Sequence, residues 1–150
     1  MLNNEDETKQ GKLAMFDGRQ RNFVVWEEKF IARAYKKKFA DVLLGKVTVP
    51  KFDEDYNNDE NKPDEAMTKI IDMNIAAYGD LVNSIDTNEE SGRTAFRLIK
   101  KTRTDAYPNG NVRQAFLNLK FKYSPSSEVD KRTTFETISL CRIVSRIFSR

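Results

Sequence analysis

The sequence contains no histidine, and its 150 residues include a single cysteine, Cys141. Without imidazole, the chain cannot build a Ser-His-Asp or Cys-His site, and it lacks the usual general base near neutral pH. One cysteine cannot form an intramolecular disulfide, and without histidine it cannot complete a structural zinc site. These missing side chains predict a protein with no catalytic residues, no metal and no cofactor, and we expect no enzymatic activity.

Glycine and long apolar segments are also scarce. The chain has only 6 glycines, which leaves little material for glycine-rich loops that bind phosphate groups. It has no run of about 18 apolar residues, so no membrane-spanning helix is expected. The first residues, up to Lys12, are polar and acidic and lack the apolar core of a signal peptide. We therefore expect a cytoplasmic or nuclear protein.

Charged residues are abundant but unevenly distributed. Residues 91–150 hold 13 of the 26 basic residues and only 4 of the 23 acidic residues, so this part is basic and residues 1–90 are acidic. Such a chain can stack head to tail with copies of itself, or turn its basic part toward nucleic acid. Solubility alone accounts for the same pattern, so these alternatives remain open.

The single tryptophan, Trp26, belongs to an aromatic stripe. Phe23, Trp26 and Phe30 are three and four residues apart, a spacing that places them on one face of an α-helix. Asn22 stands where a side-chain oxygen caps the first turn, and we expect the helix to extend to about Lys38. This helix is predicted to form the core of a small helical domain.

Helical spacing of apolar residues recurs along the rest of the chain, and no stretch alternates for long enough to predict a strand. The expected fold class is therefore all-α, a small bundle of five to six helices with mostly short connections. The chain divides into an acidic leader that is expected to be disordered, a helical domain and a basic C-terminal helix, at residues 1–15, 16–125 and 126–150. Within these parts, further helices are expected at residues 39–44, 63–84, 91–103, 112–123 and 126–150.

An acidic loop at residues 52–63 places oxygen-bearing side chains at alternate positions, as the calcium-binding loop of an EF-hand does. Three features argue against calcium. Asn58 stands where the sharp turn needs glycine, Asp64 is too short for the usual bidentate glutamate, and Pro63 interrupts the end of the loop. The sequence therefore favours a solvated acidic loop over a metal site.

Two clusters of basic residues are the remaining candidates for binding. One cluster ends the helix expected at 91–103, and the other has four-residue spacing, which lines one face of the helix expected at 126–150. Phosphate binding through these side chains would be independent of nucleotide sequence and sensitive to salt. Solvated helix faces would show the same pattern. The residues are Lys100, Lys101, Arg103, Arg142, Arg146 and Arg150.

Several local patterns also follow one another in a definite order. Together they resemble the Gag polyprotein of copia-type LTR retrotransposons, over about residues 16–135. In chain order, the patterns are Asp17-Gly18, Trp26 with Lys29-Phe30, Phe39-Ala40-Asp41-Val42-Leu43 with Gly45, Ala76-Ala77-Tyr78, Leu81-Val82-Asn83-Ser84-Ile85, Tyr107-Pro108-Asn109-Gly110-Asn111, Ala115-Phe116-Leu117-Asn118-Leu119-Lys120 and Lys122-Tyr123-Ser124-Pro125.

The resemblance implies a retroviral-capsid-like helical domain that multimerises into a shell around the RNA of its element, without catalysis and without a small-molecule substrate. Phe116 takes a place where the family commonly has tryptophan, and the family's Cys/His zinc knuckle is not found in this sequence. The alternative is a Gag-derived module, domesticated or degenerate, that binds nucleic acid or a protein partner through its basic C-terminal part. The expected core and assembly residues are Phe23, Trp26, Phe30, Tyr78, Phe96, Phe116 and Leu119.

Overall fold

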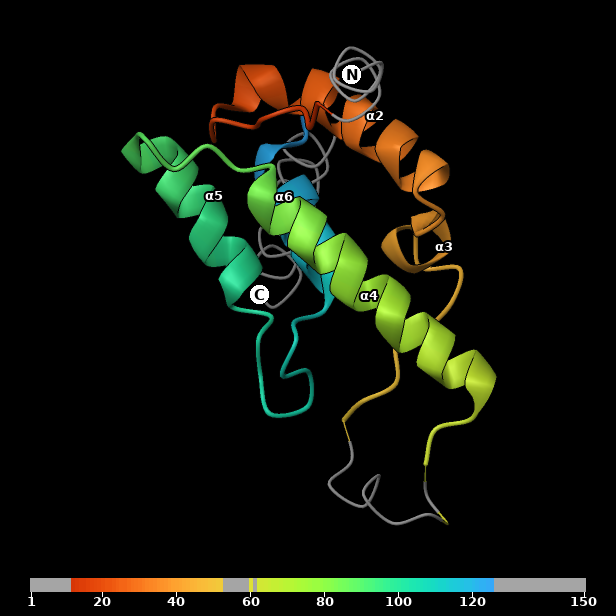
Figure 1. The fold of residues 1–150 in the computed structure, drawn as a ribbon. Helices are drawn as coiled ribbons and strands as arrows, with labels where there is room; N and C mark the ends of the chain where they lie inside the picture. Colours follow the sequence, from red (N-terminus) through yellow and green to blue (C-terminus); the bar gives the residue numbers. More distant parts are fainter. Residues whose placement is uncertain (1–11, 53–59, 61, 126–150) are drawn as a thin grey trace, which may run out of the picture.

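The computed structural model describes residues 12–52, 60 and 62–125, and within these residues the protein is a small all-α bundle (Figure 1). The prediction of an all-α fold is therefore confirmed. The helix expected at residues 126–150 lies outside the described residues, as do Cys141 and most of the acidic loop. The helices are α2 (Gln20–Lys36), α3 (Ala40–Leu43), α4 (Glu65–Asn83), α5 (Glu90–Lys100) and α6 (Val112–Tyr123).

Helix α2 begins two residues earlier than the predicted cap. Its N-cap is Arg19, and Asn22 lies inside the helix, so the assignment of Asn22 as the cap was wrong. Asp17 determines this start, because its Oδ1 accepts a hydrogen bond from the Arg19 backbone N–H at 3.0 Å and its Oδ2 accepts one from Asn22 Nδ2 at 2.8 Å. The acceptor in the preceding loop thus organises the first turn from outside the helix.

The aromatic stripe of α2 forms the centre of the core, as predicted. Trp26 is 2% exposed, and its ring centroid lies 5.2 Å from that of Phe16 and 5.2 Å from that of Phe30. Phe30 continues the cluster to Phe116 of α6, at 6.3 Å. Removing one such buried ring typically costs about 3 to 5 kcal/mol, so this cluster contributes a large share of the stability.

Helix α6 is the central element of the bundle. It packs against α3, α4 and α5, and in Figure 1 it lies behind α4. Its buried side chains recur with helical spacing, and five of its twelve residues are buried because three helices and the aromatic cluster surround it. These buried residues are Val112, Ala115, Phe116, Leu119 and Tyr123.

The chain before α2 is fastened to the connection between α4 and α5. The Phe16 N–H donates to Ser84 O at 2.8 Å, and the Asp86 N–H donates to Phe16 O at 2.9 Å. Ser91 Oγ donates to Asp17 O at 2.7 Å. Gly18 has a φ of +80°, and a Cβ there would overlap the Ser91 carbonyl, so only glycine fits this close approach.

Six of the seven predicted core residues are at most 6% exposed; Phe96 is only partly buried and packs at the edge of the core. Leu13 and Ala14, which the sequence assigned to the leader, also pack against the core, while residues 1–11 lie outside the described part. None of the helices in the described ranges has the length and apolar character needed to cross a membrane. The six buried residues are Phe23, Trp26, Phe30, Tyr78, Phe116 and Leu119.

Candidate functional site

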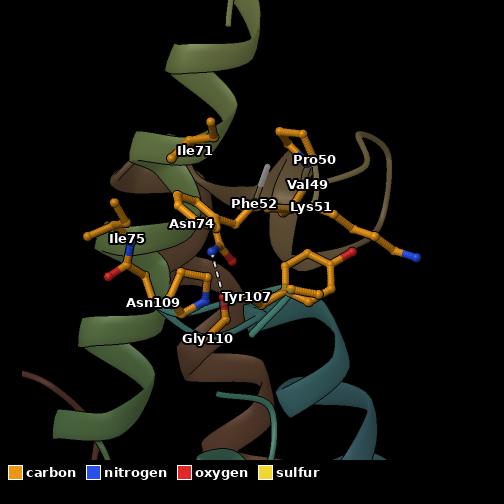
Figure 2. A pocket seen from close by; sticks show the side chains of 12 residues that line it. Val49, Pro50, Lys51, Phe52, Ile71, Asn74, Ile75, Tyr107, Asn109 and Gly110 are labelled. Atoms are coloured by element: carbon orange, nitrogen blue, oxygen red, sulfur yellow. Dashed lines mark hydrogen bonds between the residues drawn. The ribbon is translucent and has the colours of Figure 1, made fainter. Parts of the chain in front are cut away.

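A small apolar cavity lies between residues 49–52, one face of α4 and the turn at residues 106–110 (Figure 2). Its volume is about 70 Å³. Two of its lining side chains are large and exposed, Phe52 at 50% and Ile75 at 43%. The cavity is therefore an indentation in an apolar part of the surface.

Asn74 of α4 holds the wall of this cavity in place. The side chain is 3% exposed, and both halves of its amide are used. Its Nδ2 donates to Gly110 O at 2.9 Å, the bond drawn in Figure 2, and its Oδ1 accepts from the Val112 N–H at 2.9 Å. A polar residue is tolerated on this buried helix face because both of its groups are satisfied by backbone partners.

Gly110 and Tyr78 form a second contact behind the cavity. Gly110 has a φ of +84°, and a Cβ there would overlap the Tyr78 ring. The Tyr78 hydroxyl donates to Ile99 O at 3.3 Å. Burial raises the pKa of Tyr78, so the hydroxyl remains protonated and able to donate across the neutral range.

Backbone hydrogen bonds join the remaining walls. The Phe52 N–H donates to Ala106 O at 2.7 Å, which ties the segment before the acidic loop to the turn. Thr104 and Tyr107 exchange backbone hydrogen bonds at 3.2 and 3.0 Å, and this tight pairing closes the turn. The walls therefore come from three separate parts of the chain that are fixed to one another.

The size and lining of the cavity suit one small apolar group. A volume of about 70 Å³ holds roughly two waters or one aliphatic group, far below the several hundred Å³ of a typical small-molecule site. The Asn74 amide is 3% exposed, and both of its ends are bonded to the backbone, so it is committed to the wall of the cavity. If another surface covered Phe52 and Ile75, their exposed apolar area would be removed from water, which is favourable.

Only half of the predicted basic residues lie in the described part of the chain. Lys100, Lys101 and Arg103 are all exposed at the end of α5 and just beyond it. The guanidinium of Arg103 lies 5.9 Å from the centroid of the Tyr78 ring, in a cation–π contact. The other predicted residues, Arg142, Arg146 and Arg150, lie outside the described residues.

The calcium interpretation of the acidic loop falls mostly outside the described part, because residues 53–59 and 61 are not described. Among the described residues, no group of three or more His, Cys, Asp or Glu side chains is placed to hold a metal ion.

Two buried polar atoms, Trp26 Nε1 and Glu27 Oε2, have no hydrogen-bond partner within the described ranges. Burial raises the pKa of Glu27, while the positive charge of Lys120 opposes that rise.

The sequence did not predict this cavity. The only local signal was Asn74, a polar residue within the apolar stripe of the third predicted helix, and its partners lie 36 and 38 residues away.

Comparison of the chain with models of protein families, with curated proteins and with solved structures gives no match. Function must therefore be inferred from the residues and their arrangement.

Proposed function

We propose that this chain is a structural protein of the Gag type, a capsid-like domain of a copia-type LTR retrotransposon that self-associates around RNA and performs no catalysis. The observation that carries the proposal is that the ordered motifs of the resemblance meet one another at the joints of one bundle. These contacts place the motifs in one structural unit, as a capsid-like domain requires.

Two joints support this interpretation. The Trp26 ring lies 6.4 Å from the Phe116 ring, which joins two of the motifs. Tyr78 packs on Gly110, which joins the motif on α4 to the turn before α6. Each contact links segments that are distant in the sequence and that the family resemblance places in the same order.

Self-association is supported by the apolar surface around the cavity. Phe52 and Ile75 remain half exposed at its rim, and the cavity is of the size that one aliphatic side chain fills. We propose that a second copy of the chain covers this surface. A contact in which a projecting side chain of one copy enters a hollow of the next is heterologous, and repetition of such a contact builds rings or extended assemblies.

Sedimentation velocity and light scattering over rising protein concentration test the proposal. Wild-type protein should show concentration-dependent oligomers. Ile75→Glu should shift the midpoint of association to at least tenfold higher concentration, because association would remove the charged carboxylate from water. Val25→Glu is the matched control, since Val25 is 59% exposed but does not line the cavity. A wild-type protein that stays strictly monomeric at high concentration and high salt would contradict the proposal.

A second candidate function is a Gag-derived module, cytoplasmic or nuclear, that binds nucleic acid through its basic part. The exposure of Lys100, Lys101 and Arg103 favours it. Electrophoretic shift of a short RNA at low salt should weaken when these three residues are changed to Gln, and the dependence on salt should flatten. Lys69→Gln serves as the control, and absence of any shift at low salt removes this candidate.

A further inference from the structure

The turn that forms one wall of the cavity contains Asn109-Gly110, the only Asn-Gly pair in the sequence. In such a pair the glycine nitrogen can attack the carbonyl carbon of the asparagine side chain, because glycine has no Cβ to hinder the approach. Every other asparagine of the sequence precedes a residue that has a side chain. Asn109 is also exposed, so water reaches its amide. The turn therefore contains the groups needed for spontaneous deamidation.

The reaction requires only this residue pair and water. The Gly110 nitrogen loses its proton to solvent and forms a bond to Cγ of Asn109. The side-chain nitrogen leaves as ammonia, and a cyclic succinimide remains. Water then opens the succinimide at either carbonyl carbon and gives aspartate or isoaspartate. In isoaspartate the main chain passes through Cβ and Cγ, so it is longer than in aspartate by one methylene group.

The closed turn restrains the reacting nitrogen. The Gly110 N–H donates to Tyr107 O at 2.9 Å, so its proton is held by a carbonyl group. Gly110 O accepts a hydrogen bond from Asn74 Nδ2 at 2.9 Å, and Gly110 itself is buried against the Tyr78 ring. These contacts fix the backbone on both sides of the Gly110 nitrogen. Attack on Asn109 therefore requires the turn to open.

The position of the turn favours local opening over unfolding of the whole bundle. Residues 103–105, 108 and 109 are exposed, and segments with little buried area open at a lower free-energy cost than core helices do. Thr104 Oγ1 accepts a hydrogen bond from the Tyr107 N–H at 3.2 Å, which is at the long end of the range for strong bonds. The turn can therefore separate from α4 while the aromatic cluster stays packed.

We propose that Asn109 is a self-modification site, at which opening of the turn frees the Gly110 nitrogen and the resulting isoaspartate prevents the turn from closing again. The added methylene group displaces Gly110 from Tyr107 O, and the Asn74 amide loses its acceptor. A reversible opening thereby becomes permanent, and this wall of the cavity is lost. The inference depends on the chemistry of the turn, so it holds or fails independently of the proposed Gag-type function.

Incubation of the full-length protein at mildly alkaline pH, followed by peptide mass spectrometry, tests the site. Asn109 should be the fastest of the described asparagines to deamidate in the folded protein. Its rate should rise by about tenfold or more in guanidinium chloride, because unfolding removes the restraint on the Gly110 nitrogen. Equal rates with and without denaturant would overturn the proposal, as would faster deamidation of Asn83 than of Asn109 in the folded protein.

Variants outside the reacting pair distinguish local opening from global unfolding. Asn74→Ala and Thr104→Ala each remove a hydrogen bond that holds the turn, so each should raise the rate at Asn109 by about fivefold or more in the folded protein. Thr104→Ala keeps the test available if Asn74→Ala does not fold. Asp64→Ala removes the cap of α4 instead and should leave the rate nearly unchanged. Rates that follow only the loss of overall stability in all three variants would overturn the proposal.

The modified protein itself tests the consequence for the fold. Ion exchange separates it from unmodified protein, because deamidation adds a negative charge. The isoaspartate form should have a lower urea midpoint than unmodified protein and faster amide hydrogen exchange at Val112, whose N–H is bonded to Asn74. Asn109→Asp is the matched control, since it carries the same charge on an ordinary main chain and should keep the wild-type midpoint. An equal loss of stability in both forms would assign the effect to charge and overturn the proposal.

Discussion

At the scale of single residues, the buried side chain of Asn74 joins two separate parts of the structure. Its amide fastens the turn before α6 to the middle of α4 through Gly110 and Val112. Asn74 has helical spacing from Ile70, Ile71 and Tyr78, which puts it on the apolar stripe of the helix expected at 63–84. Its partners could not be predicted, because they depend on how distant segments pack. Local patterns therefore predicted where Asn74 would lie and not what it would bind.

Replacing Asn74 with alanine should lower the free energy of unfolding by about 2 to 3 kcal/mol. The change leaves a buried N–H and a buried C=O without partners, and each such group typically costs 1 to 3 kcal/mol. Urea denaturation measures the effect. Asn83→Ala on the exposed side of the same helix is the control and should change stability by less than about 0.5 kcal/mol.

Glu27 provides a prediction about pH. Burial raises its pKa, so the folded protein binds this proton more tightly than the unfolded chain does. The favourable contribution of Glu27 is therefore complete below the unfolded pKa and is lost as pH rises through the raised folded pKa. At neutral pH the ionised carboxylate destabilises the fold, with no hydrogen bond to Oε2 within the described ranges.

Glu27→Gln should consequently stabilise the protein at neutral pH by a few tenths of a kcal/mol, a small value because the side chain is only half-buried. The difference from wild type should disappear near or below pH 4, where both side chains are neutral. Urea midpoints at the two pH values measure it, with exposed Glu28→Gln as the control. A loss of stability at neutral pH would show that attraction to Lys120 outweighs the cost of burial.

At the scale of elements, apolar periodicity predicted the type and order of all the described helices. The ends were less predictable, because they depend on groups outside each helix. Asp17 displaced the expected cap of α2 from Asn22 to Arg19. The helix expected from Pro63 begins two residues later, because Asp64 is the N-cap of α4 and Glu65 is its first residue.

The cap of α4 gives a prediction at this scale. Asp64 Oδ1 accepts a hydrogen bond from the Met67 N–H at 2.7 Å, which satisfies one donor of the first turn. Asp64→Ala should therefore lower the free energy of unfolding by about 1 kcal/mol. Thermal unfolding followed by circular dichroism measures the change, and Asp72→Ala, an exposed position within the same helix, should have a smaller effect.

At the scale of the whole molecule, the aromatic cluster joins segments from both ends of the described chain. The sequence predicted most of this core because its residues lie on helical stripes, and Phe96 was the exception, since it faces the edge of the bundle. The cavity was not predicted, because its walls combine loops with a helix. Hollows of this kind depend on packing that no single stripe describes.

The single tryptophan makes the cooperativity of the bundle measurable. Trp26 contacts Phe16 before α2 and Phe116 on α6, so its environment should change only when these elements separate. Urea unfolding followed by tryptophan fluorescence should therefore coincide with unfolding followed by circular dichroism, as expected of a two-state domain. Midpoints that differ beyond experimental error would mean that α2 separates before the other helices melt.

The ring of Phe16 also lies 5.0 Å from that of Tyr123, so one of the earliest described residues packs on one of the last. A ribosome completes Tyr123 only after more than one hundred further residues have been added, at about 5 to 20 residues per second. For several seconds the aromatic residues of α2 are therefore synthesised but cannot yet be covered by α6. Closure of the bundle must therefore wait until Tyr123 has left the ribosome, and copies of this domain can meet as finished units only after that point.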